Sequence, residues 1–174
     1  MAESLALDVG ASLDWVFEET LDLTTISDAS KLQFSGNFTN GTGEDQADRL
    51  WHDQRTLTTA TSEDLDLTAL TTTMFANNVS VSLATVRALF VINTATAAGE
   101  DLLIGGAGAA GDAWASPMNG DQDAQLVVPA GSMLMLVNKK DDWPVTDGSA
   151  DQLRIANNGA GDITYKIVIV GTSS

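Results

Sequence analysis

The chain contains no cysteine and only one histidine, His52, among its 174 residues. Without cysteine there are no disulfides and no thiolate metal sites, which suits assembly in a reducing compartment such as a cytoplasm. One histidine cannot supply the histidine sets of common zinc sites or catalytic centres. Its neighbour Asp53 falls on the opposite face of an extended strand, which disfavours a local dyad. We therefore expect no enzymatic activity, no metal and no cofactor.

Basic residues are also scarce. Eight Lys and Arg oppose 24 Asp and Glu, giving a formal net charge of −16. Such a surface repels phosphate backbones and anionic lipids, so neither a nucleic-acid nor a membrane partner is expected. Two explanations of the charge remain open: solubility through mutual repulsion, or a partner that presents a basic face or bound cations.

Long apolar runs are missing as well. None approaches the roughly 20 residues that a membrane-spanning helix needs. The N-terminal segment has neither a basic region nor a long apolar region, so no secretory signal is expected. Apolar residues nevertheless make up 44% of the chain, and its length fits one domain with its own core.

Short segments that are alternating in polarity or continuously apolar recur along the sequence and predict strands. They lie at residues 31–38, 49–61, 65–69, 79–83, 88–92, 102–104, 126–128, 133–137, 153–155 and 163–170. Turn residues separate many of them, for example at 40–43 and 158–159. Eight to ten strands without a long helix predict an all-β fold: a single-domain antiparallel β-sandwich, with a jelly roll as the preferred version. The runs 88–92 and 133–137 are apolar on both faces, which predicts central strands covered on both sides.

Residues 1–30 differ from the rest because they are acidic and rich in threonine. We expect them to form an extended N-terminal arm with an edge strand, followed by the β-sandwich domain over residues 31–174. Leu13, Trp15 and Phe17 alternate with polar or smaller residues, which favours a strand. A helical stripe through positions 13, 16, 17 and 21 is the alternative.

One motif superficially suggests a nucleotide site. Gly106, Gly108 and Gly111 match the G-x-G-x-x-G pattern after a predicted strand. The following residues, 112–120, contain proline and glycine and cannot sustain the helix that such a site requires. The sequence therefore predicts a flexible loop between strands.

Carboxylates cluster in several predicted loops. A hard cation such as Ca²⁺ prefers six to eight oxygen ligands, and no cluster completes an EF-hand loop. We expect solvated loop acids instead. A hydrolase that uses two carboxylates is possible in principle, but 24 acids make some close pair inevitable. The clusters are Glu44, Asp45 and Asp48; Asp121 and Asp123; and Asp141 and Asp142.

The four tryptophans are the candidate interface residues, because binding hot spots favour tryptophan. They are Trp15, Trp51, Trp114 and Trp143. Burial in the protein's own core is the structural alternative for each of them. A sugar-stacking platform formed by the last three is a further possibility.

Three stretches together carry a family resemblance. They are the segment from Asn40 to Asp53, the run from Ala88 to Asn93 with Gly105-Gly106-Ala107, and the closing segment with Trp143-Pro144-Val145-Thr146-Asp147-Gly148, Leu153 to Asn157 and Ile163 to Gly171. From about residue 37 to the C-terminus the chain resembles small β-rich structural proteins encoded in tailed-bacteriophage genomes.

The resemblance implies a virion component without a known active site. Small β-sandwich proteins of this kind often act as decoration, or cement, proteins that sit as trimers on the outside of a capsid. We therefore expect a non-enzymatic homotrimer on the outer capsid surface that binds the major capsid protein and stabilises the head by bridging its subunits. The arm and the loops 40–48, 105–123 and 139–150 would make the contacts. The alternative is a carbohydrate-binding or fibre- or tail-associated β-sandwich module.

Overall fold

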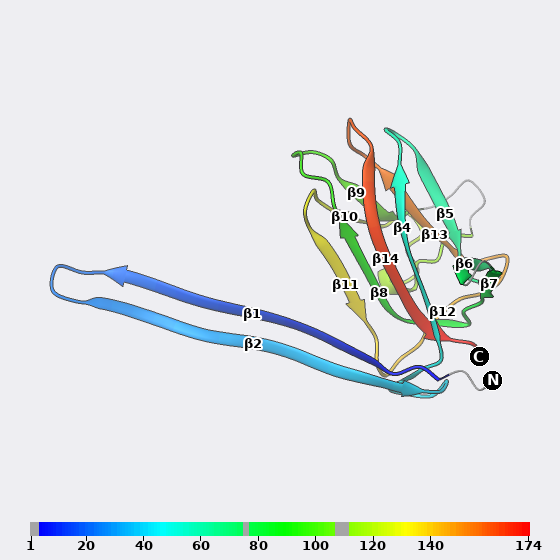
Figure 1. Ribbon diagram of the computed structural model, residues 1–174, viewed down its shortest axis with the longest axis horizontal. Helices are drawn as coiled ribbons and strands as arrows, with labels where there is room; N and C mark the ends of the chain where they lie inside the picture. The colour runs from blue at the N-terminus through cyan, green and yellow to red at the C-terminus, as the bar shows by residue number, and fades with distance from the viewer. Residues whose placement is uncertain (1–3, 75–76, 107–111) are drawn as a thin grey trace.

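The computed structural model of the chain is an all-β protein in which a β-sandwich carries a long two-stranded arm (Figure 1). It describes residues 4–74, 77–106 and 112–174. The predicted antiparallel β-sandwich is thus confirmed. Within the described residues the only helical element is one 3₁₀ turn, Ser116–Met118, and no helix is long and apolar enough to cross a membrane.

Two sheets form the sandwich. The first contains, in spatial order, β10 (Gln125–Val128), β9 (Leu102–Gly105), β13 (Gln152–Asn157) and β5 (Ser62–Asp66). The second contains β11 (Met133–Val137), β8 (Thr85–Asn93), β14 (Ile163–Thr172) and β4 (Arg49–Leu57), with β12 (Trp143–Pro144) beside β8. A small hairpin of β6 (Leu70–Met74) and β7 (Asn77–Val81) lies between β5 and β8 in the chain.

The strand pairs of the sandwich are nested in the sequence. The first strand, β4, pairs with the last, β14, and β5 pairs with β13. Further in, β8 pairs with β11 and β9 with β10. All four pairs are antiparallel, so the chain behaves as one long hairpin that is folded over on itself.

The main core lies between the two sheets. Its side chains come from alternate positions of each strand, as the period of two requires. Along β14, Ile163, Tyr165, Ile167 and Ile169 are buried, which matches the alternation of the sequence. Trp51 of β4 and Trp114 are among the largest fully buried side chains.

The expectation that residues 133–137 form a central strand covered on both sides is wrong. β11 is the edge strand of its sheet, and only its inward side chains, Leu134 and Leu136, pack against the main core. Met133, which points outward, is 64% exposed. One apolar face of β11 therefore packs on the core, whereas the other is an outer face that the body of the protein leaves partly uncovered. Residues 88–92, by contrast, do lie in the central strand β8.

The arm is a hairpin of β1 (Leu7–Thr20) and β2 (Thr25–Asn40), and it projects far from the sandwich (Figure 1). The strand alternative for residues 13–17 is therefore correct and the helical stripe is not. β2 continues without interruption through residue 30, where the arm was expected to end, and then pairs with the short parallel strand β3 (Gln46–Ala47) at the body.

Candidate functional site: an apolar hairpin arm

The two faces of the arm differ sharply in chemistry. Residues that are directly opposite each other on paired strands project to the same face. Ala11 lies opposite Phe34, Leu13 opposite Leu32, and Phe17 opposite Asp28. We call this face the apolar strip; its side chains beyond the body are Ala11, Leu13, Trp15, Phe17, Ile26, Leu32 and Phe34.

The opposite face of the arm is polar. Asp14 lies opposite Lys31, and their charged groups form a loose ion pair of 3.7 Å. Glu18 lies opposite Ser27, and Ser12 lies opposite Gln33. Val16 is the large apolar exception on this face. The period of two thus separates most apolar side chains from most polar ones along the arm.

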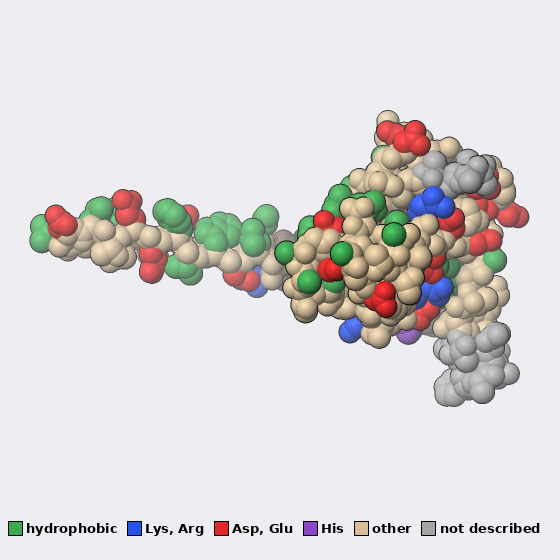
Figure 2. All heavy atoms as spheres, turned by 90° about the horizontal axis from the view of Figure 1, so that it is seen from above, with side chains coloured by type: hydrophobic (Ala, Val, Ile, Leu, Met, Phe, Trp, Pro, Cys, Tyr) green, Lys and Arg blue, Asp and Glu red, His purple; other side chains and the backbone are tan. Residues whose placement is uncertain are grey.

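The apolar strip is exposed to solvent. Phe17 is 70% exposed, and Trp15, which donates a long hydrogen bond of 3.5 Å from Nε1 to Asp28 Oδ2, is 38% exposed. Figure 2 shows hydrophobic side chains along much of one long edge of the arm. Burying a large apolar side chain contributes about 1.5–3 kcal/mol, so covering this strip would contribute several kcal/mol. Exposed apolar patches of this kind mark interaction sites.

The arm is anchored where it meets the body. Phe38 is buried beneath the Lys139 ammonium, whose Nζ lies 5.7 Å from the ring centroid. Phe38 also packs with Ala88 and Val170 in a second hydrophobic cluster, which includes Leu7 from the other strand. The arm therefore leaves the body with its apolar strip facing the outer surface of the second sheet.

Two of the predicted contact loops, 40–48 and 139–150, come together at this root. Asp45 accepts hydrogen bonds from Lys140 and Lys139, the latter at 3.1 Å. These two contacts lower the pKa of the Asp45 carboxyl below its ordinary value, and the hydrogen bond from Lys140 has the larger effect. The buried Arg87 guanidinium donates to the carbonyl oxygens of Gly43 and Asp141, at 3.1 and 2.7 Å. Hydrogen bonds and ion pairs of charged side chains thus hold the two loops together at the root of the arm.

The outer face of the second sheet is the other apolar surface. Leu89 and Val91 of β8 belong to the main core. Because side chains alternate along a strand, Ala88 and Phe90 point outward. The remaining outward apolar side chains are Leu50, Ile92, Met133, Met135, Val137, Val168 and Val170.

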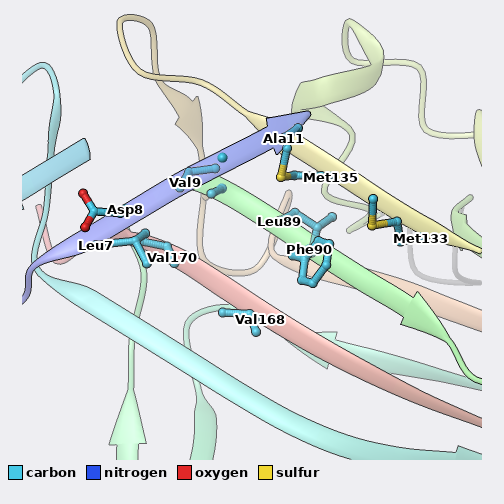
Figure 3. A pocket seen from close by; sticks show the side chains of 12 residues that line it. Leu7, Asp8, Val9, Ala11, Leu89, Phe90, Met133, Met135, Val168 and Val170 are labelled. Carbon is cyan, nitrogen blue, oxygen red and sulfur yellow. The ribbon is translucent and has the colours of Figure 1, made fainter. Parts of the chain in front are cut away.

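A groove of about 310 Å³ lies between this outer face and the arm (Figure 3). Leu7, Val9 and Ala11 of β1 form one wall. Phe90, Met133, Met135, Val168 and Val170 are among the residues of the other wall. Sequence reasoning missed this groove, although the doubly apolar run at 133–137 was a signal for it.

The tryptophans, predicted as interface anchors, fall in different environments. Trp51 and Trp114 are 2% and 1% exposed, and their Nε1 atoms donate to the carbonyl oxygens of Thr71 and Pro144, each at 2.9 Å. Trp143 is half-buried and meets Trp114 edge to face at 6.4 Å. A sugar platform of Trp51, Trp114 and Trp143 is therefore not formed. Trp15 lies on the exposed arm.

The acidic clusters are engaged by protein groups rather than gathered around a cation position. Asp48 accepts hydrogen bonds from the backbone N and Oγ of Ser173, at 2.8 and 2.6 Å. Asp142 lies 2.8 Å from Arg87, and Asp121 accepts the backbone N–H of Asp123. Among the described residues there is no group of three or more acidic, histidine or cysteine side chains that could hold a metal ion.

Two sequence features remain, His52 and the glycine motif. His52 is exposed on the outward face of β4, whereas Asp53 pairs with Arg55 at 3.0 Å. The glycine motif falls largely outside the described residues, since Gly108 and Gly111 lie in the segment 107–111. Comparison with protein-family models, with curated proteins and with solved structures finds no match for this chain.

Proposed function

We propose that this chain is a non-enzymatic structural protein of a tailed-phage virion, and specifically a capsid decoration protein that bridges capsid subunits on the outer surface of the head. The observation that carries this proposal is the arm, which extends an exposed apolar strip away from the folded body. An isolated two-stranded hairpin with an exposed apolar face is only marginally stable in water, so we expect a partner to cover the strip. A protein that joins neighbouring subunits needs such a contact surface.

The composition agrees with this role. A net charge of −16 keeps a protein soluble at high copy number and disfavours binding to packaged DNA. The resemblance of residues 37–174 to phage structural proteins supplies the biological setting. In the proposed assembly the protein is a homotrimer, because closed symmetry covers surfaces that a monomer leaves exposed, and its partner is the major capsid protein.

We also propose that the sandwich is a jelly roll. The nested pairs β4 with β14, β5 with β13, β8 with β11 and β9 with β10 support this assignment, as do two sheets that share eight principal strands. Viral capsid domains use this architecture, but lectins and cupins use it too, so the function depends on the arm and not on the fold.

An arm-shortened variant tests the proposal. Replacing residues 12–33 by Asn-Gly joins Ala11 to Phe34, which are cross-strand partners, through a two-residue turn. The body and the root of the arm are left unchanged. The experiment is co-sedimentation of full-length and shortened protein with heads of the encoding phage that lack it, together with mass spectrometry of purified virions.

The full-length protein is expected in virions and in the pellet with the heads, and the shortened variant in the supernatant. Absence from virions combined with no binding to heads would overturn the proposal. Glycan binding by a protein that never binds heads would instead favour the carbohydrate-binding or fibre-associated alternative.

A further inference from the structure

We infer that the apolar strip of one copy docks on the outer face of the β11-β8-β14 sheet of a second copy, so that copies of this chain assemble by exchanging arms. The inference rests on the proposed assembly function and names the partner of the arm. It accounts for the exposed strip and for the uncovered part of the outer sheet face with a single type of contact.

The first argument is continuity with a contact that already exists within the chain. At its root the arm uses the same strip on the same sheet, where Leu7 and Phe38 pack with Ala88 and Val170. Farther along, the strip and the sheet diverge and leave the groove between Ala11 and Met135 (Figure 3). A second arm laid on the rest of the sheet would extend this packing with side chains of the same kind.

The second argument is size. The part of the arm from Ala11 to Thr20 spans about 34 Å and two strands are about 10 Å wide. On the receiving sheet the chain's own root already covers Ala88 and Val170, so the second arm lies across the remaining outward side chains of β8, β14 and β11, among them Phe90, Val168 and Met133. One such contact buries at most roughly 700 Å² on both partners together, below the about 1,200 Å² of a stable specific interface. A single contact is therefore insufficient, and a closed assembly, in which every copy both gives and receives an arm and so takes part in two contacts, is favoured over an open pair.

The third argument is charge. The two acids on the strip side of the arm are Glu19 and Asp28, which lie opposite Ile26 and Phe17. On the receiving face, Lys166 is the charged outward residue of β14, between Thr164 and Val168. These signs are complementary. Packing of arms against one another would instead place acids of the same sign together and would leave the sheet bare.

Two exposed positions and two matched controls test the inference by light scattering after size exclusion. Phe17→Asp puts a charge on the apolar strip. Its control, Val16→Asp, puts a charge on the polar face of the same strand, and the two positions are similarly exposed, Phe17 at 70% and Val16 at 67%. Met133→Asp puts a charge on the receiving sheet, whereas Val127→Asp, at a residue that is 56% exposed, puts it on the other sheet. Thermal melting checks that all four variants remain folded.

The unmodified protein and both controls are expected at the same multiple of 18.2 kDa, and Phe17→Asp and Met133→Asp at 18.2 kDa. Assembly that is lost with Phe17→Asp but retained with Met133→Asp would mean that arms pack on each other and would overturn the inference. An unmodified protein that is monomeric would also overturn it. Failure of the proposed function is distinguishable, because it would leave an arm-exchanged assembly that does not bind heads.

Discussion

At the scale of single residues, the most informative group is Tyr165, the only tyrosine of the chain. It is buried in β14 and its hydroxyl donates a hydrogen bond of 2.7 Å to Glu63 Oε1. Arg55 Nε donates to the other oxygen of that carboxylate at 2.6 Å. Burial and the hydrogen bond to Glu63 raise the pKa of the Tyr165 hydroxyl far above its ordinary value, and burial has the larger effect.

This shift predicts how stability depends on alkaline pH. The folded-state pKa of Tyr165 is above the unfolded value of about 10. The folded state therefore holds the proton more tightly, and the free energy of unfolding falls as pH rises above about 10. We expect tyrosinate absorbance near 295 nm to appear together with loss of the near-ultraviolet circular dichroism, because the single tyrosine ionises only when the core opens.

Tyr165→Phe provides the control for this prediction. It keeps the ring in the core and removes one hydrogen bond, so we expect a loss of about 1 kcal/mol at neutral pH and a weaker alkaline decline. Ionisation of Tyr165 with an ordinary pKa in the folded protein would contradict the assignment.

Sequence patterns predicted the inward residues of β14 because alternation alone determines which positions share a face. They could not assign the tryptophans. Trp51 and Trp15 both lie in alternating strands, but Trp51 faces a second sheet and Trp15 faces solvent. Which face of a strand is covered depends on contacts between distant segments.

At the scale of elements, Arg87 links the two loops at the root of the arm. Its side chain joins the loops at Gly43 and Asp141 and is buried among them. We expect Arg87→Met to lower the free energy of unfolding by about 1.5–3 kcal/mol, because the carbonyl oxygens of Gly43 and Asp141 lose a charged donor. Urea denaturation measures this loss, and hydrogen exchange of residues 41–47 is expected to become faster.

Lys31→Met is the matched control for Arg87. Lys31 forms an exposed ion pair with Asp14 at 3.7 Å, so its removal is expected to change stability by less than about 1 kcal/mol. Equal effects of the two substitutions would show that the guanidinium does not hold the root together.

Strands of the arm were predictable as elements but their arrangement was not. Alternation indicated strands around Trp15 and from Lys31 to Phe38, and the sequence contains both signals. Their pairing into one long hairpin depends on the turn at residues 21–24, which contains no glycine or proline. The prediction for the doubly apolar run at 133–137 was wrong for a related reason: a strand covered on both faces and an edge strand with one uncovered apolar face have the same sequence pattern.

At the scale of the whole molecule, charge and apolar contact oppose each other. Copies that each carry −16 repel one another, while the proposed arm contact is mainly apolar. The screening length falls from about 30 Å at 0.01 M salt to about 3 Å at 1 M. We therefore expect the assembled fraction to rise with salt concentration, as measured by sedimentation velocity. Dissociation at high salt would mean that ion pairs, and not the strip, hold the copies together.

The central claim is that the arm joins this protein to its neighbours, and the molar mass of the arm-shortened variant tests it most directly. The variant lacks residues 12–33 but keeps the complete sandwich and the buried Phe38. Light scattering of both proteins at one concentration is expected to give a multiple of 18.2 kDa for the full chain and a monomer for the variant. The same oligomeric state for both proteins would contradict the account.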